Sequence, residues 1–134
     1  MIALLPGKPV SEMISVRERD GEMVIDEVPG LNAFYSLGDV VEIKRRNGSP
    51  YVANLIKSSE WSNFGIRIVE YFREDAIKIL TALEKNGAII VGRPRVMINI
   101  AVKPSEYALV YEVLEQGEER GIWTATVVIN RSGQ

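Results

Sequence analysis

Short runs of alternating apolar and polar residues fill the first part of the chain, and turn-forming pairs separate them. Two β-hairpins are predicted from these runs, with strands over 13–16 and 23–25 about Asp20-Gly21, and over 39–44 and 51–56 about Asn47-Gly48. Asp-Gly and Asn-Gly pairs supply the positive φ angles that tight hairpin turns require. We therefore expect residues 1–57 to form a β-hairpin part.

The period of the apolar residues changes along the rest of the chain. Residues 57–65 are polar and without a period, which predicts a loop. Six elements follow: strand 66–71, helix 73–86, strand 88–91, strand 95–102, helix 105–117 and strand 122–129. Asn86-Gly87 is expected to end the first helix, and Ser105 to cap the start of the second. Residues 131–134 are expected to fray.

The order of these elements predicts an α+β fold with a ferredoxin-like βαββαβ arrangement over residues 66–130. In that arrangement, two helices cover one face of a four-stranded antiparallel sheet. The hairpins over 1–57 are expected either to extend the sheet or to close as a small barrel, within a single domain over 1–134. Because this arrangement hosts ligand-binding domains, RNA-binding domains and enzymes, it leaves the function open.

The last strand before the second helix shows a clear alternation. One face is expected to carry Val96, Ile98, Ile100 and Val102, and the other Met97, Asn99 and Ala101. RNA-binding members of this fold usually carry aromatic residues in such strands, and none is present here. This strand therefore does not favour RNA binding on the sheet.

The 134 residues include neither histidine nor cysteine. The chain therefore lacks the commonest general base near neutral pH, the thiol nucleophile and the best zinc ligands. It has no phosphate-binding glycine loop, and Lys57 is the one base that adjoins its Ser58-Ser59 pair. An enzyme is the least expected class, and we expect no cofactor and no metal ion.

The charge balance limits the classes of partner. A formal net charge of −2 and a pI of about 5.3 give no overall attraction to nucleic acid or anionic membranes. A local basic face is compatible with both values. No apolar run approaches the roughly 18 residues that span a bilayer. We expect a cytoplasmic protein without membrane contact. The missing cysteine and scarce glutamine are also typical of thermophile proteins.

Arginine is concentrated near two predicted turns, at the tip of the second hairpin and around Pro94. The candidate anion-binding residues are Arg45, Arg46, Arg67, Arg93 and Arg95. A guanidinium group pairs with phosphate through two parallel hydrogen bonds, so a shared face of these residues suits a phosphate backbone. The alternative is that they are ordinary solubilising charges at turns and strand edges.

Two aromatic residues, Trp61 and Phe64, lie in the predicted polar loop. An aromatic side chain held in a polar loop is suited to stacking on a base, a sugar or a partner protein. The alternative is that the loop folds back and Trp61 closes the open end of the sheet.

The leading hypothesis is a non-enzymatic binding module for a nucleic acid or a phosphorylated small ligand, which the arginines and the two aromatic residues contact. The alternative is a structural or regulatory subunit that binds a protein partner or forms a homo-oligomer. The second predicted helix favours this alternative because its apolar residues, among them Leu109 and Val113, occupy more than one side.

Overall fold

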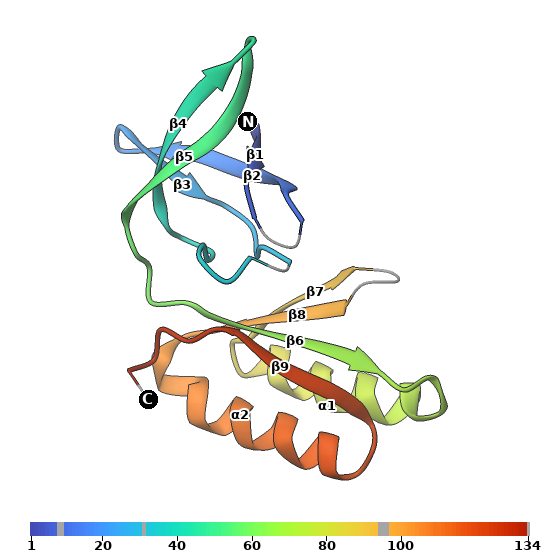
Figure 1. The fold of residues 1–134 in the computed structure, drawn as a ribbon. Coiled ribbons are helices and arrows are strands. Elements are labelled where there is room, and N and C mark those ends of the chain that lie inside the picture. Colours follow the sequence, from blue (N-terminus) through green and yellow to red (C-terminus); the bar gives the residue numbers. More distant parts are fainter. Residues whose placement is uncertain (8–9, 31, 94–96, 134) are drawn as a thin grey trace.

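The fold has two parts, a β-barrel and a sheet covered by helices, and the barrel lies against the face of the sheet that the helices leave free (Figure 1). The computed structural model describes residues 1–7, 10–30, 32–93 and 97–133. These residues form an α+β structure with two α-helices and mostly antiparallel strands. Among them, neither helix has the length and apolar content needed to cross a membrane.

The described strands of the barrel are β1 (Ile2–Leu5), β2 (Glu12–Arg19), β3 (Glu22–Ile25), β4 (Val40–Arg46) and β5 (Ser49–Lys57). Consecutive strands pair antiparallel. Because five such strands end in the direction in which they began, β1 and β5 close the barrel as a parallel pair at Leu4 and Tyr51. The hairpins therefore form a small barrel and do not extend the sheet. Strand β1 is not evident from the sequence pattern, because its four residues are all apolar and show no alternation.

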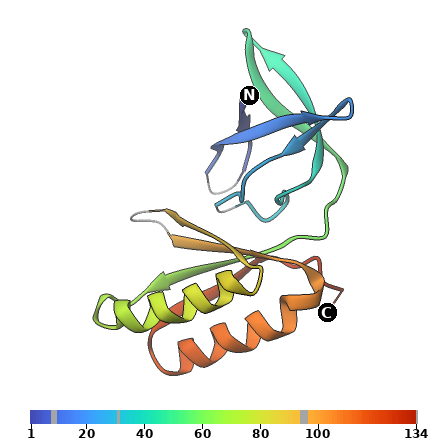
Figure 2. The same ribbon diagram turned by 180° about the vertical axis from the view of Figure 1, so that it is seen from behind.

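Both predicted hairpin turns are confirmed. The φ angles are 53° and 83° at Asp20 and Gly21, and 52° and 82° at Asn47 and Gly48. The strands run up to these two-residue turns, so the second hairpin projects from the barrel as a long two-stranded tip (Figures 1 and 2). Inward-facing side chains fill the barrel, among them Leu5, Ile14, Val16, Ile25, Val41 and Val52.

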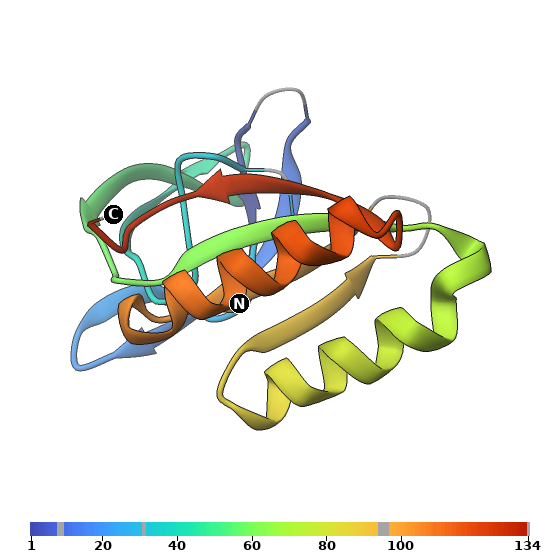
Figure 3. The same ribbon diagram turned by 90° about the horizontal axis from the view of Figure 1, so that it is seen from below.

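The second part contains β6 (Ser62–Ile68), α1 (Arg73–Lys85), β7 (Ile89–Arg93), β8 (Met97–Val102), α2 (Pro104–Glu119) and β9 (Trp123–Ile129). Its strands lie in the order β7-β8-β6-β9, and every neighbouring pair is antiparallel. Both helices lie on one face of this sheet (Figure 3). The core between sheet and helices includes Phe64, Ile66, Ile100, Leu80, Val110 and Leu114.

Strand β6 begins earlier than the sequence predicts. The expected loop over 57–65 contains the start of β6, and the expected end of the strand at residue 71 is a 3₁₀ turn over Glu70–Phe72. The side chains of Ser62 and Asn63 are buried, and each hydrogen-bonds backbone from a distant segment. These polar side chains therefore form buried hydrogen bonds. A run of polar residues without a period predicts an exposed loop instead.

The start of α2 also differs from the prediction. Lys103 is the N-cap residue and Pro104 occupies the first turn, so Ser105 is not the cap. Proline suits this place because its φ is preset and it has no N–H to leave unsatisfied. The predicted cap of α1 is confirmed, with Gly87 at a φ of 106°. Strand β7 continues through the break expected at Gly92, and Val96 of the predicted alternation lies outside the described residues.

Helix α2 is expected to end at Gly117, but it continues to Glu119. The glycine has another role, because it lets the helix approach Trp123. A Cβ atom at position 117 would lie 2.7 Å from Nε1 of the Trp123 indole. The indole is fixed, since Nε1 donates a hydrogen bond of 2.9 Å to the carbonyl of Leu114. Trp123 is almost fully buried, so close contact between α2 and β9 depends on a residue without a side chain.

We expect Gly117→Ala to lower the free energy of unfolding by about 1–3 kcal/mol, the usual cost of overpacking a core. Urea denaturation followed by circular dichroism measures this change. Gly92→Ala is the control, because a Cβ atom there meets no atom within 4 Å. A loss no larger for position 117 than for position 92 would show that α2 does not need this close contact.

Candidate functional site

Buried polar side chains gather where the barrel meets the sheet. In the described part of the chain, the buried polar residues are Asn32, Ser36, Asp39, Ser62, Asn63 and Asn99. They belong either to the barrel segment 28–39 or to the sheet strands that this segment approaches. Burying a polar group is costly unless it is hydrogen-bonded, so the partners of these residues decide what the junction does.

Two asparagines of the sheet bind consecutive carbonyls of the barrel. The amide nitrogen of Asn63 donates to the carbonyl of Pro29 at 2.8 Å, and that of Asn99 donates to the carbonyl of Gly30 at 2.6 Å. Gly65 pairs with Asn99 between the two strands. A Cβ atom at Gly65 would overlap Sδ of Met97, so the space in front of the asparagines is already filled.

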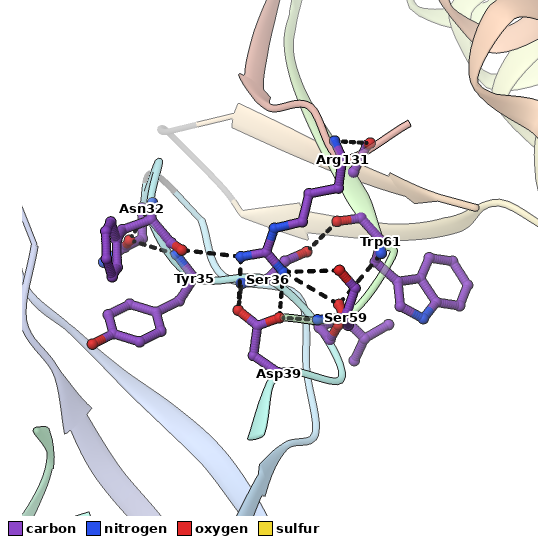
Figure 4. A network of polar contacts seen from close by, with 10 residues as sticks. Asn32, Tyr35, Ser36, Asp39, Ser59, Trp61 and Arg131 are labelled. Carbon is purple, nitrogen blue, oxygen red and sulfur yellow. Dashed lines mark hydrogen bonds and ion pairs between the residues drawn. The ribbon is translucent and has the colours of Figure 1, made fainter. Parts of the chain in front are cut away.

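An ion pair between Asp39 and Arg131 joins the barrel to the C-terminal segment (Figure 4). Asp39 is fully buried, and 12% of the Arg131 side chain is exposed. Nη1 of Arg131 donates to Oδ1 of Asp39, and Nη2 donates to Oδ2 at 2.9 Å. Arg131 also donates to the carbonyls of Phe34 and Ser59. The expectation that the chain frays from residue 131 is therefore wrong for Arg131.

Backbone donors complete the environment of Asp39. The N–H of Ser36 donates to Oδ2 at 2.9 Å, and the N–H of Ser59 donates to Oδ1 at 2.7 Å. Each carboxylate oxygen thus accepts one backbone N–H and one guanidinium N–H. Burial, and then the charge of Asp39, raise the pKa of Tyr35 above the usual value for tyrosine. These hydrogen bonds join Asp39 to three segments of the chain and hold the segments together. They also engage both carboxylate oxygens of Asp39.

The structure divides the predicted basic residues between two ends of the molecule (Figures 1 and 2). Arg45 and Arg46 are exposed at the tip of the β4–β5 hairpin, far from the sheet. Arg67 is exposed on β6, and Arg93 lies on β7 opposite Met97 of β8. Arg95 lies outside the described residues. The sequence leaves open whether these residues share one face, and Arg45 and Arg46 do not share a face with Arg67.

The two predicted aromatic residues have different environments. Phe64 is 2% exposed and stacks on Tyr107 with the ring centroids 5.1 Å apart, so it belongs to the core and is not an exposed stacking residue. Trp61 is half-buried in the connection between β5 and β6, with Nζ of Lys103 5.6 Å from its ring centroid. The Trp61 ring also lies beside Gly38 of the barrel. Trp61 therefore lies at the junction, far from the hairpin tip.

A row of side chains on the outside of the barrel is not evident from the sequence pattern. The register places Met13 of β2, Leu4 of β1, Tyr51 of β5 and Lys44 of β4 next to one another. Their neighbours Ala3, Ile14 and Val52 are buried, so these four face outward. The guanidinium of Arg46 lies over the Tyr51 ring, 5.2 Å from its centroid. We call these five outward residues the barrel strip.

The signal for the barrel strip in the sequence is weak. Tyr51 follows the Asn47-Gly48 turn closely, so its place near Arg46 follows from the hairpin. The apolar side of the strip depends on the pairing of β1 with β5, which lie at opposite ends of the barrel sequence. A pattern of residues along the chain does not predict a pairing at that distance.

Two comparisons with known proteins give a match that includes both parts of the chain. The family model described as "Domain of unknown function (DUF4265)" matches residues 12–125, which include most of the barrel and most of the second part. A crystal structure of a hypothetical protein from Neisseria gonorrhoeae is similar, with a TM-score of 0.78 and 22% identity over 96% of this chain and 95% of that chain. This similarity shows a shared fold. No curated protein matches the chain.

We expect Arg131→Met to lower the free energy of unfolding by about 3–5 kcal/mol, because the carboxylate of Asp39 would stay buried without its cation. Urea denaturation measures the loss. Arg73→Met is the matched control, since it breaks an exposed ion pair with Glu70 and should cost less than about 1 kcal/mol. Equal small losses in both variants would contradict a structural role for the buried pair.

Proposed function

The chain belongs to the family described as "Domain of unknown function (DUF4265)", and we propose that it is a non-enzymatic binding module whose ligand is a single-stranded nucleic acid. The ligand lies along the barrel strip and the adjoining tip of the β4–β5 hairpin. Phosphate groups contact Arg45 and Arg46, and a base stacks beside Tyr51.

The observation that carries this proposal is the position of Arg46 over the ring of Tyr51 on an exposed strip. Binding of single strands combines cationic side chains that follow the backbone with aromatic surfaces on which bases stack. Arg45 hydrogen-bonds the carbonyl of Gly48 through Nη1, which holds its guanidinium at the tip. Leu4 and Met13, both exposed, extend the strip with an apolar surface on the far side of Tyr51.

The shape of this surface favours a polymer over a phosphorylated small ligand, the other expected ligand class. Four strands about 4.8 Å apart give the row a length of roughly 14 Å, which suits successive nucleotides. An open hollow of about 450 Å³ lies beside β2 and β3, but its lining includes Glu18 and Asp26. Arg17 also lines it but pairs with Asp26, so a phosphate in this hollow would lie close to two carboxylates.

We further assign the second part of the chain to the ferredoxin-like arrangement. The order β6-α1-β7-β8-α2-β9 and the strand order β7-β8-β6-β9 support this assignment. In this proposal the second part is a support for the barrel, because segment 28–39 covers the sheet at Asn63 and Asn99, leaving that region unavailable to a ligand.

The alternative function, a structural or regulatory subunit, is favoured by one observation. Leu109 and Tyr111 are both exposed on α2 and lie two positions apart, so large apolar side chains face solvent on more than one side of this helix. A homo-oligomer that buries them would show a mass that rises with concentration. Light scattering over a hundredfold range of concentration tests this, and a constant monomeric mass would exclude self-association through α2.

For the leading proposal, we expect the protein to bind labelled single-stranded DNA and RNA with an affinity that falls steeply with salt. Arg45→Gln with Arg46→Gln removes two phosphate contacts, which should reduce the slope of log K against log salt by about 1.4. Fluorescence anisotropy at several salt concentrations measures both quantities.

Lys78→Gln with Lys85→Gln on α1 is the control for net charge, and its slope should equal that of the unchanged protein. Tyr51→Leu should weaken binding at all salt concentrations while leaving the slope unchanged, because it removes stacking and no charge. Flat anisotropy for the unchanged protein at low salt would refute nucleic-acid binding. Equal slopes for the hairpin and α1 variants would refute the placement of the ligand.

A further inference from the structure

An open groove lies between α2 and the edge of the sheet, on the opposite part of the molecule from the barrel strip. Phe64, Leu114 and Ala125 line it, and partly exposed Tyr111 and Val127 border it. Its volume is about 160 Å³. An apolar cavity of about 150 Å³ holds benzene, so the groove has room for one aliphatic or aromatic side chain.

The groove runs beside a strand edge with which no other strand of the described residues pairs. β9 is the last strand in the order β7-β8-β6-β9. The N–H of Val69 donates to the carbonyl of Ile122, so these two residues form a hydrogen-bonded pair. Hydrogen-bonded and non-hydrogen-bonded pairs alternate along antiparallel strands, so the backbone N–H and C=O groups of Ala125 and Val127 point away from β6. The N–H of Ala125 is already taken by Oε1 of Glu118 at 3.1 Å. The backbone of Val127 is the next position at which an added strand can pair.

The charges around the groove restrict what can bind there. Glu115 and Glu118 line it, and Glu112 lies one turn earlier on α2. In the described residues these three carboxylates form no ion pair with a lysine or arginine. A second copy docking through the same face would bring like charges together, which is unfavourable. A segment with lysine or arginine beside its apolar residue meets both requirements.

We propose that the α2–β9 groove docks an extended segment of another protein, which adds as a strand along β9. One aliphatic side chain of the segment fills the groove, and a neighbouring lysine or arginine pairs with Glu115 or Glu118. Addition of a strand to an exposed sheet edge is an established mode of peptide recognition, in which main-chain bonds give affinity and side-chain pockets give specificity. This site is separate from the barrel strip, so either proposal can fail alone.

The probes for the test are two peptides, Thr-Lys-Val-Leu-Val-Lys-Thr and its acidic counterpart Thr-Glu-Val-Leu-Val-Glu-Thr. Each is titrated into the isotope-labelled protein, and backbone amide shifts are followed by NMR. We expect the lysine peptide to shift the amides of Ala125 and Val127 and to bind at least tenfold more tightly than the glutamate peptide. Shifts should be absent from the β4–β5 hairpin.

Two variants locate the contacts. Glu115→Gln with Glu118→Gln should weaken binding of the lysine peptide about three- to tenfold, the effect of two exposed ion pairs. Val127→Pro removes an outward N–H without breaking the β6–β9 pairing and should abolish binding. Glu74→Gln with Glu84→Gln on α1 is the matched control and should leave the affinity unchanged.

Four results would overturn the proposal. One is the absence of shifts at Ala125 and Val127 with either peptide at millimolar concentration. Another is equal affinity for the two peptides. The third is an unchanged affinity in the Glu115→Gln, Glu118→Gln variant, and this measurement remains a test if Val127→Pro does not fold. The fourth is the appearance of the same shifts when the protein alone is concentrated, which would assign the groove to a second copy.

Discussion

The buried carboxylate of Asp39 is the constraint on which the arrangement of the two parts depends. Each part has its own apolar core, and the contacts identified between them are largely polar. A carboxylate without exposure requires a cation and hydrogen-bond donors, and these come from Arg131, Ser36 and Ser59. The barrel segment, the connection to β6 and the C-terminal segment are therefore held in one geometry.

This junction determines which surfaces remain for binding. The amides of Asn63 and Asn99 bind the barrel, so the region of the sheet around them is covered on that side, and the helices cover the other. The outside of the barrel and the edge of the sheet at β9 stay open. They differ in chemistry: the barrel strip combines Arg46 with Tyr51, whereas the α2–β9 groove is bordered by carboxylates such as Glu115. The two proposals therefore concern two different classes of partner.

The sequence predicts the elements whose cause is local. The Asn47-Gly48 turn and the Gly87 cap require positive φ angles, and the residues themselves supply that preference. Predictions fail where a residue has a distant partner. The sequence places Asn63 in an exposed loop, because nothing near it in the chain indicates a buried partner. That partner, the carbonyl of Pro29, belongs to the barrel. Gly117 is predicted to end a helix, whereas it leaves space for the ring of Trp123. That ring belongs to β9, so the helix sequence gives no sign of it.

The same division applies to the candidate sites. By itself, the sequence determined two hairpins, two helices, the α+β class and the exposed pair Arg45 and Arg46, because each follows from residues near in the chain. Only the tertiary structure decided that Phe64 is core, that Arg67 lies far from the hairpin tip, and that Tyr51 adjoins Leu4. These facts depend on strand pairing and on the buried pair of Asp39 with Arg131. Such contacts join distant residues, and their energy has no counterpart in local periodicity or turn preference.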